Sequence, residues 1–426
     1  MNKPTRKTNH APAFSARGHA LHLLGEMLRE HQTLDEAIAH HPLTGSEPDQ
    51  KFARSLVLTT LRHVGQVDAL LKHYIDKPLP AKRMGITNAL RLGVVQLLVL
   101  GTPSHAAVNE TVTLVKKGRD AALAGLVNAV LQKITREQPS LPGPIHNLPI
   151  WLRTRWEKTY GKETVAAIAQ VAAARAPLDI NTRSDMPNAT RLDHQMIRMP
   201  ADHAEVESLA GYEEGAFFVQ DVAASYPARL LGDVKGLRVL DICAAPGGKT
   251  AQLMQAGATV TALDRSGARL KTLAINMNRL GHRVEVVEAD ALQWQPPAAY
   301  EAILLDAPCS ATGTWRRHPE VVHLLREGDM AELVALQRDI LARAWSWLKP
   351  GGKLVYCVCS LERDEGEAQA EWFLQHQSDA RLLPVDASTE IPAECVTQGY
   401  VRTLPSHLAE KGGMDGFFAA CFTKSA

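Results

Sequence analysis

From residue 236 onward, short apolar runs alternate with stretches whose apolar residues recur at helical spacing. Runs rich in Val, Ile and Leu predict buried parallel strands, and the stretches between them predict amphipathic helices. The alternation therefore predicts an α/β domain with a doubly wound, Rossmann-like sheet and helices on both faces. The predicted strands are 238–242, 259–264, 284–290, 302–306 and 353–359, and two of the predicted helices are 268–280 and 331–347.

Each predicted strand ends in an acidic residue or a cysteine. Ligands of doubly wound sheets bind at the carboxyl ends of the strands, so we expect these residues to surround one site. A helix cap is the ordinary role of a single Asp at such a position. Its recurrence on consecutive strands favours a shared site instead. The residues are Asp241, Asp264, Asp290, Asp306 and Cys359.

The first predicted strand runs into a loop of small residues with the sequence CAAPGGKT, residues 243–250. Small residues let the backbone approach a ligand closely, and the following helix offers free amides. A P-loop would need glycine where Cys243 stands, and no G-x-G-x-x-G motif is present, which disfavours an ATPase or a nicotinamide enzyme. Asp264 can accept hydrogen bonds from both ribose hydroxyls, and Asp290 from an adenine amino group. Together these features favour S-adenosylmethionine as the cofactor.

Two cysteines are predicted at the carboxyl ends of neighbouring strands. Cys309 follows Pro308 just after the fourth strand, and Cys359 ends the fifth. Carbon 5 of cytosine is a poor nucleophile, but a thiolate added at carbon 6 turns the ring into an enamine that can attack a methyl group. A carboxyl group at ring nitrogen 3 would assist this addition, and Asp306 is the candidate. The residues alone leave open which cysteine is the nucleophile.

The remaining cysteines are interpreted as small core residues. Cys357 lies inside the fifth predicted strand, and the same interpretation holds for Cys395 and Cys421. No second Cys or His pair stands at a zinc-ligand spacing from Cys357 and Cys359, so we predict no metal site.

A catalytic thiol, whose ordinary pKa is about 8.5, needs nearby positive charge to lower its pKa. Lys249, Arg316 and Arg317 are the candidate sources. The two arginines follow Trp315 in a predicted loop, and arginines beside an aromatic ring can stack on a base and hold phosphates. The start of a capped helix is the alternative interpretation of this segment.

The front of the chain has a different pattern. Residues 15–137 show helical apolar spacing and no alternating strand pattern, which predicts an all-helical domain. Residues 1–150 carry 18 Lys and Arg against 11 Asp and Glu, although the whole chain has a net charge of only +1. This excess is a mild indication of a polyanionic partner, with a solvated helical surface as the alternative. The other predicted segments are a basic flexible tail at 1–14, a Pro-rich linker at 138–149, a small α+β bridging subdomain at 150–230 and the cofactor domain at 231–426.

The sequence gives no sign of a membrane or secretory protein. No run approaches the roughly 18 apolar residues of a membrane helix, and the first residues lack the apolar core of a secretory signal. Six cysteines in 426 residues do not form a disulfide scaffold. We therefore expect a cytoplasmic protein with reduced thiols.

Three motifs closely resemble those of the bacterial RsmB-type (Fmu/Sun) 16S ribosomal RNA cytosine-5 methyltransferases. They are CAAPGGKT at 243–250, DAPCSATGTWRRHPE at 306–320 and CS at 359–360. The resemblance covers nearly the whole chain, because segments 218–221 and 415–418 also resemble the family. The front domain resembles NusB, an RNA-binding helical fold, through segments 104–110 and 126–131. After the Cys-Ser pair the family usually shows Glu-Glu-Asn, where this chain has ERDEGE at 362–367.

The resemblance implies S-adenosylmethionine-dependent methylation of carbon 5 of a cytosine in 16S ribosomal RNA. It ranks Cys359 as the nucleophile that adds to carbon 6 and Cys309 as the residue that helps to resolve the adduct, with Asp306 in contact with the base. The residues that it implies for the cofactor are Cys243, Ala244, Ala245, Pro246, Gly247, Gly248, Lys249, Asp264, Asp290 and Asp306.

The expected partner is 16S ribosomal RNA, naked or in an assembling small subunit, bound by a monomer without DNA or membrane partners. One alternative is the same chemistry on transfer RNA or another ribosomal RNA site. A second alternative, suggested by the front domain alone, is a non-catalytic RNA-binding or antitermination factor. The pair Cys309 and Cys359 argues against the second alternative.

Overall fold

The computed structural model describes residues 15–387 and 390–425, so the predicted tail at 1–14 lies outside the described residues. The chain divides into two compact units. The first is Met1–Leu152 with His318–Leu325, and the second is Arg153–Arg317 with Arg326–Ala426. Segment 318–325 thus packs with the first unit, although the sequence placed it within the cofactor domain.

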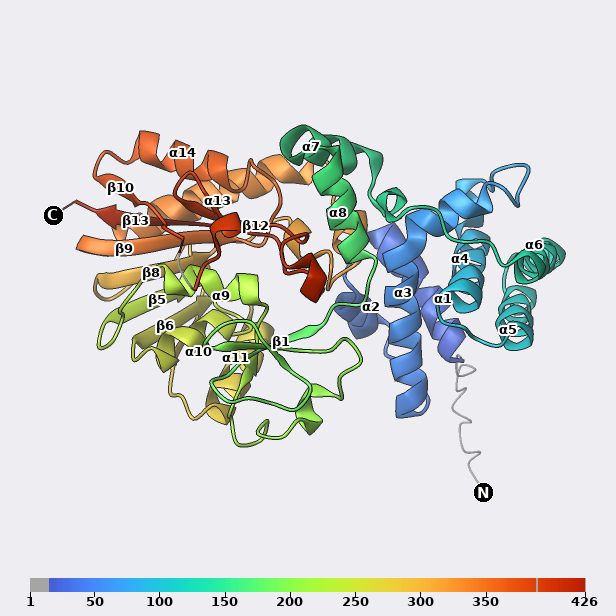
Figure 1. Cartoon of the computed structure of the whole chain (residues 1–426), viewed down its shortest axis with the longest axis horizontal. Coiled ribbons are helices and arrows are strands. Elements are labelled where there is room, and N and C mark those ends of the chain that lie inside the picture. Colours follow the sequence, from blue (N-terminus) through green and yellow to red (C-terminus); the bar gives the residue numbers. More distant parts are fainter. Residues whose placement is uncertain (1–14, 388–389, 426) are drawn as a thin grey trace, which may run out of the picture. The chain divides into compact units, whose positions relative to one another are not determined.

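The first unit is built of helices, as the apolar spacing predicted. Side-chain caps set several helix starts, since Ser15, Thr33 and Ser46 each accept a hydrogen bond from a first-turn amide. The apolar faces meet in one core that includes Leu23, Leu90 and Val127. The helices are α1 (Ala16–Glu30), α2 (Leu34–His40), α3 (Glu47–Leu71), α4 (Met84–Leu98), α5 (Ser104–Lys117), α6 (Ala124–Glu137) and α12 (Val321–Leu324) (Figure 1).

In the sequence, two helices and a small antiparallel sheet follow the front helices and precede the strands of the large sheet. The sheet has the strand order β2-β3-β1-β4. Its strands are β1 (Leu178–Asn181), β2 (Thr190–Arg191), β3 (Met196–Met199) and β4 (Phe218–Val219). The helices are α7 (Ile150–Tyr160) and α8 (Lys162–Ala172).

The second unit contains a nine-stranded sheet with the strand order β11-β12-β13-β9-β8-β5-β6-β7, in which β10 also pairs with β13. Strands β5 to β9 run parallel, whereas β13 is antiparallel to β9. The parallel strands are β5 (Arg238–Ile242), β6 (Thr259–Asp264), β7 (Glu285–Glu288), β8 (Tyr300–Asp306) and β9 (Leu348–Val358). The others are β10 (Ala380–Leu383), β11 (Val396–Thr397), β12 (Tyr400–Thr403) and β13 (Phe417–Lys424). This confirms the doubly wound class, with Asp290 and Cys359 just beyond their strands.

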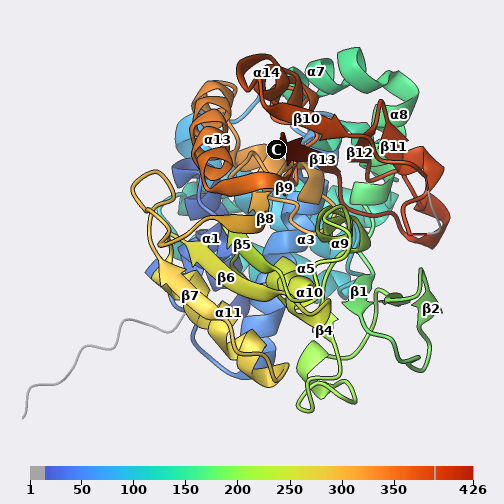
Figure 2. The same cartoon turned by 90° about the vertical axis from the view of Figure 1, so that its left-hand side faces the viewer.

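Alternate residues of the strands pack against helices on opposite faces of the large sheet (Figure 2). Along β8, Ala302 and Leu304 belong to the core with α9 and α10, whereas Ile303 and Leu305 belong to the core with α13 and α14. This period of two is that of a strand buried on both faces. The helices are α9 (Val222–Arg229), α10 (Gly248–Gln255), α11 (Gly267–Arg279), α13 (Asp329–Ser346) and α14 (Glu367–His376). Over the described ranges, no helix has both the length and the apolar character needed to cross a bilayer.

Candidate active site

A cavity of about 340 Å³ lies among the residues that follow the parallel strands. Six of the residues singled out from the sequence line this cavity. Four of them lie at strand ends, and two lie in the loops after β5 and β8. They are Cys243, Asp264, Asp290, Asp306, Cys309 and Cys359. The cavity size falls within the range of small-molecule sites. A single pocket therefore holds the acids and both thiols.

The two thiols of the cavity are adjacent. The Sγ atoms of Cys309 and Cys359 lie 3.5 Å apart, and both residues are partly exposed. The hydrogen bond with Cys359, together with burial, raises the pKa of Cys309 well above its usual value. Cys309 therefore keeps its proton at neutral pH. By contrast, Cys357, Cys395 and Cys421 are buried, as their interpretation as core residues predicted.

The buried carboxylate of Glu365 ties the two cysteine loops together. It accepts hydrogen bonds from the Ser310 amide at 2.9 Å and from the Ser310 hydroxyl at 2.6 Å. The Ser360 hydroxyl donates to the same carboxylate, and so does Gln337 at 2.9 Å. Ser310 follows Cys309 and Ser360 follows Cys359, so Glu365 fixes the residue next to each thiol. The sequence reasoning missed Glu365, which lies in the ERDEGE segment where the chain departs from the family pattern.

Further contacts hold the segment after Cys359. Arg402 donates to the Ser360 carbonyl at 2.6 Å and pairs with Glu367 at 2.7 Å. From α7, Arg155 and the Trp156 indole donate to the Glu362 carboxylate at 2.8 and 2.6 Å. Because these buried charged groups have hydrogen-bond partners, they hold the segment after Cys359 rigidly.

Gly313 allows the loop after β8 to pass close to the backbone before β13. A Cβ on Gly313 would lie 1.8 Å from the Gly416 carbonyl oxygen, so no other residue fits there. The Gly313 amide donates to the Cys359 carbonyl at 3.0 Å, and the Gly416 amide donates to the Gly313 carbonyl at 2.8 Å. The loop of Cys309 is thereby joined to the end of β9.

Positive charge lies close to the thiols, as expected for Lys249 and Arg317. The Lys249 Nζ lies 2.8 Å from an Asp306 carboxylate oxygen. Burial works against the charge of Lys249, but Asp306 outweighs it and raises the lysine pKa above its usual value. Both Lys249 and Arg317 interact electrostatically with Cys359. This is the field that stabilises a thiolate.

Trp315 and Arg316 do not lie where a base could stack. Both side chains are about 1% exposed. Arg316 pairs with Asp221 at 2.5 Å and with Asp415 at 3.5 Å, and Arg317 pairs with Asp415 as well. The interpretation of Trp315 and Arg316 as a nucleic-acid contact is therefore wrong, because two buried carboxylates distant in sequence hold the arginine inside the fold.

The loop after β5 supports the cavity more than it lines it. Of residues 243–249 only Cys243 reaches the cavity wall, so Ala244, Ala245, Pro246, Gly247, Gly248 and Lys249 remain predictions as cofactor contacts. The Ala245 amide donates to Asp264 at 3.2 Å, and the Ser266 amide donates to the same carboxylate at 2.9 Å. Arg265 and Arg269 also line the cavity, and sequence reasoning missed both.

Asp241 has a different place from the other strand-end acids. It is fully buried and accepts a hydrogen bond from the Thr250 hydroxyl at 2.6 Å. Burial raises its pKa to about 7. Asp241 anchors the start of α10 and does not line the cavity.

The comparisons with known proteins match both ends of the chain. The family model described as 16S rRNA methyltransferase RsmB/F matches residues 228–423, and that of the NusB family matches residues 15–136. Ribosomal RNA small subunit methyltransferase B of Citrobacter koseri is 33% identical, with 94% of this chain and 96% of that protein covered. The protein of the same name from Vibrio cholerae is 34% identical over 88% and 90% of the two chains. The chain belongs to the RsmB/F family.

Solved structures agree with membership of the RsmB/F family. The crystal structure of PH0851 has a TM-score of 0.71 and 21% identity and covers 98% of this chain and all of that one, which is a likeness of fold. A methyltransferase homologue from Pyrococcus horikoshii has a TM-score of 0.54 and 25% identity, covering 69% of this chain and 98% of that one. This RsmB/F family member is thus an RNA methyltransferase with a NusB-like front domain.

Proposed function

We propose that this protein methylates carbon 5 of a cytosine in 16S ribosomal RNA, with S-adenosylmethionine as the methyl donor and a covalent adduct to Cys359. The observation that carries the proposal is the pair of thiols 3.5 Å apart in the wall of a cavity that three carboxylates also line. Methyl transfer to an amine or hydroxyl needs no thiol. Two adjacent thiols suit a reaction that both forms and breaks a carbon–sulfur bond.

The chemistry of the cavity fits the proposed cofactor. Asp264 ends β6 and Asp290 follows β7, and carboxylates at these positions are the acceptors that ribose hydroxyls and an amino group require. Asp306 lies in the same wall, and its carboxylate is paired with Lys249. S-adenosylmethionine, when bound, supplies an electrophilic methyl group.

Cys359 acts first in the proposed mechanism. Its Sγ interacts electrostatically with Lys249 and Arg317 and lies 3.5 Å from the Cys309 Sγ. The thiolate forms a bond to carbon 6, the ring gains electron density at carbon 5, and Asp306 assists through a hydrogen bond at the ring edge. With S-adenosylmethionine bound, carbon 5 would take its methyl group, and the electron pair of the methyl–sulfur bond would remain on the cofactor sulfur.

Cys309 acts second in the proposed mechanism. Removal of the carbon-5 proton re-forms the carbon 5–carbon 6 double bond and expels the Cys359 thiolate. The Cys309 thiol lies beside the sulfur that leaves; it gives its proton to that sulfur, and the Cys309 thiolate formed in this way takes the carbon-5 proton. Its raised pKa suits a group that carries a proton at neutral pH and can exchange it during the cycle.

We further propose that the front unit binds the RNA, that the protein acts as a monomer and that it works in the cytoplasm. The family model for NusB over residues 15–136 and the excess of Lys and Arg in residues 1–150 support RNA binding. The names of the curated relatives support a small-subunit ribosomal RNA as substrate.

We expect Asp264→Asn to weaken S-adenosylmethionine binding by roughly tenfold to hundredfold, the effect of losing a hydrogen bond to a charged group. Asparagine keeps the oxygen that accepts the Ser266 amide, but its nitrogen cannot accept from the Ala245 amide, so circular dichroism is used to check the fold of the variant. Isothermal titration with the cofactor measures the change. Asp233→Asn is the matched control, because Asp233 also accepts a backbone amide two residues on but does not line the cavity. Equal affinities in both variants would contradict the assignment of Asp264.

We expect Cys309→Ala to accumulate a covalent protein–RNA adduct that survives denaturation. The carbon–sulfur bond to Cys359 still forms in this variant, but its breakage is slowed. Incubation with unmodified 16S RNA and S-adenosylmethionine, followed by denaturing electrophoresis, measures the adduct. The double variant that adds Cys359→Ala is the control and should show none. An adduct in Cys359→Ala alone would reverse the two roles.

A further inference from the structure

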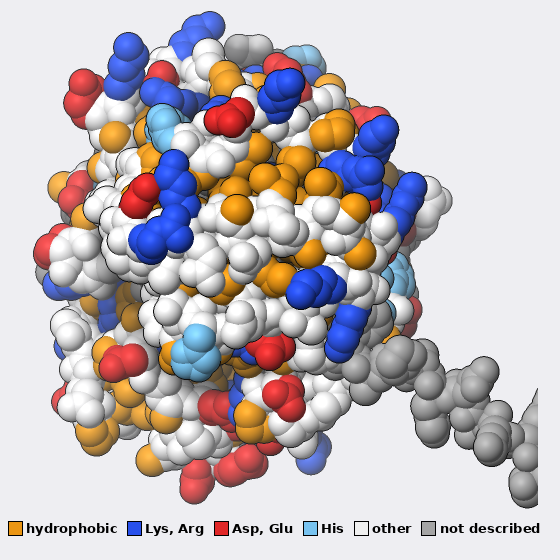
Figure 3. All heavy atoms as spheres, turned by 90° about the vertical axis from the view of Figure 1, so that its right-hand side faces the viewer, with side chains coloured by type: hydrophobic (Ala, Val, Ile, Leu, Met, Phe, Trp, Pro, Cys, Tyr) orange, Lys and Arg blue, Asp and Glu red, His pale blue; other side chains and the backbone are white. Residues whose placement is uncertain are grey.

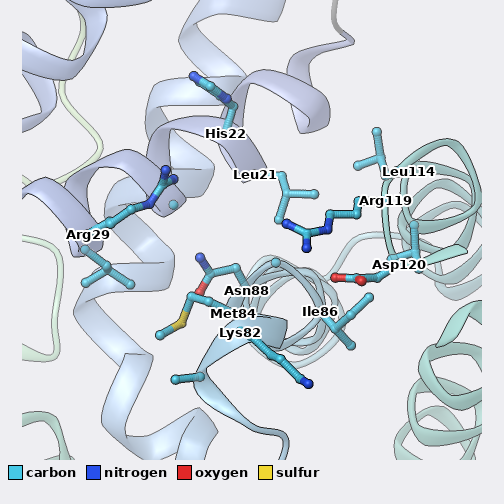
Figure 4. A pocket seen from close by; sticks show the side chains of 16 residues that line it. Leu21, His22, Arg29, Lys82, Met84, Ile86, Asn88, Leu114, Arg119 and Asp120 are labelled. Atoms are coloured by element: carbon cyan, nitrogen blue, oxygen red, sulfur yellow. The ribbon is translucent and has the colours of Figure 1, made fainter.

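A second cavity lies within the first unit, and none of its lining residues lines the cofactor site. It has a volume of about 560 Å³ and lies between α1, the start of α4 and the end of α5. Figure 4 shows side chains from these elements around it, with the guanidinium of Arg119 lying beside Leu21. The size suits a nucleotide and exceeds what a single ion needs.

One polar side chain of the pocket, Asn88, has a hydrogen-bond donor that no group of the described chain uses. Asn88 is 1% exposed, and its Oδ1 accepts a hydrogen bond from Arg91 at 2.8 Å. Arg91 is itself fixed by two bonds to Asp68, at 2.8 and 2.6 Å, so the orientation of the amide is set. Within the described part of the chain, nothing accepts a hydrogen bond from the Asn88 Nδ2.

An amide donor buried without an acceptor is costly, so its presence calls for an acceptor from outside the chain. Gly25 places no side chain over this amide; a Cβ there would lie 3.9 Å from the Asn88 Nδ2 and 3.7 Å from a guanidinium nitrogen of Arg29. Leu21, Ile86 and Leu114 add apolar surface to the wall of the pocket. A flat, partly apolar group with hydrogen-bond acceptors at its edge fits these surroundings, and an unpaired nucleobase is such a group.

Positive charge surrounds the pocket. Arg29, Lys82 and Arg119 line it, whereas the one acidic lining residue, Asp120, is held in an ion pair by Arg83. Lys82 and Arg119 have no ion pair with any residue that the structure describes. Helix α4 also begins at the pocket without a side-chain cap, which adds the partial positive charge of a helix start. On the face shown in Figure 3, Lys and Arg side chains stand around a hydrophobic area.

We propose that this pocket binds one unpaired nucleotide of the RNA, with the Asn88 amide donating to the base edge and Arg119 and Lys82 contacting the neighbouring phosphates. The inference rests on the proposed function, in which the front unit binds RNA, and adds the form that this RNA takes. Recognition of an unpaired base gives a preference for loops and unfolded segments over duplex RNA.

Two glycines allow the pocket to be tested by substitutions that do not alter the hydrophobic core. Gly85 lines the pocket, and a Cβ on it would meet no atom within 4 Å, so Gly85→Leu adds a side chain at the pocket wall whose first atom is unobstructed. Gly125 is equally unobstructed and, like Gly85, is the second residue of its helix, but it does not line the pocket. Gly125→Leu is therefore the matched control.

The measurement is the fluorescence anisotropy of labelled single-stranded RNA pentamers, and of a labelled RNA duplex, with the full-length protein. We expect Gly85→Leu and Arg119→Ala each to weaken single-strand binding about tenfold, as expected for one stacked base, with Gly125→Leu unchanged. Equal affinities in the two leucine variants would overturn the pocket, as would an effect of Arg119→Ala alone. In a second experiment, free nucleoside monophosphates compete with the labelled pentamer for the protein. If a monophosphate binds more tightly than the pentamer, the pocket binds free nucleotides and not RNA.

The same variants separate this inference from the proposed function. If native protein and Gly85→Leu both transfer methyl groups with the same KM for RNA, the proposed reaction is supported and the proposed nucleotide pocket is contradicted. If Gly85→Leu weakens RNA binding but the native protein does not methylate cytosine, the pocket is supported and the proposed reaction is contradicted.

Discussion

Cys359→Ala is expected to lower the rate of methyl transfer by roughly 10⁴-fold or more, because the reaction loses its nucleophile and the remaining contacts cannot activate carbon 5. The Sγ of Cys359 lies beside Cys309 in the wall of the cavity, and the thiol donates no hydrogen bond that the fold requires elsewhere. Stability and cofactor affinity should therefore stay close to those of the native protein. Single-turnover transfer of a labelled methyl group to RNA measures the loss.

The control for this prediction is Cys421→Ala. Cys421 is buried in β13 and does not line the cavity, so its removal is expected to leave the rate of transfer unchanged. A loss of similar size in both variants would mean that the cysteines matter for folding and not for the reaction. Retention of activity in Cys359→Ala would remove the covalent mechanism through this residue.

Arg316→Met is expected to lower the free energy of unfolding of the second unit by about 3–5 kcal/mol, because it leaves two buried carboxylates without their shared partner. Arg316 is 1% exposed between Asp221 and Asp415. Urea unfolding followed by tryptophan fluorescence measures the change. Six of the seven tryptophans of the chain lie in the second unit, so the signal reports on that unit.

Arg363→Met is the matched control. Arg363 pairs with Glu371 at 3.3 Å, and these side chains are 60% and 47% exposed. Exposed pairs contribute only about 0–1 kcal/mol, so the same substitution there should have little effect. Similar losses in the two arginine variants would contradict the importance of the buried network.

The effect of Arg316→Met should depend on pH. Burial tends to raise the pKa of Asp221, but Arg316 and Arg317 outweigh burial and lower it below its usual value. A lowered pKa contributes stability that is present above the unfolded-state pKa of about 3.9 and is lost as the pH falls through the folded-state value. The native protein loses this contribution in acid, whereas the variant protonates its unpaired carboxylate. The difference between native protein and variant should therefore shrink as the pH falls, first above about pH 4, where the variant's unpaired carboxylate takes up its proton, and then below it, where native Asp221 does.

The parts of the fold with a local period could be predicted from the sequence. Strand β8 is a continuous apolar run because both of its faces are buried, and α11 and α13 lie within two residues of their predicted ranges. The position of Asp264 at a strand end was sufficient to place it in the cavity. Such features are determined by residues that are close in the sequence, so a sequence pattern can reveal them.

Features that depend on distant partners could not be predicted. Glu365 joins Ser310 and Ser360 through a carboxylate whose local sequence looks like an ordinary charged turn. Arg316 has the sequence context of an exposed basic loop, yet Asp221 and Asp415 draw it inside. The packing of segment 318–325 with the first unit also follows from long-range contacts. An acid six residues after Cys359 was the only local signal for Glu365.

The most direct test of the account is methyl transfer from labelled S-adenosylmethionine to unmodified 16S ribosomal RNA, followed by nucleoside analysis of the product. Native protein, Cys359→Ala and Cys421→Ala are compared side by side. The account predicts labelled 5-methylcytidine with native protein and Cys421→Ala and none with Cys359→Ala. A label on another nucleoside, or on another atom of cytidine, would contradict it.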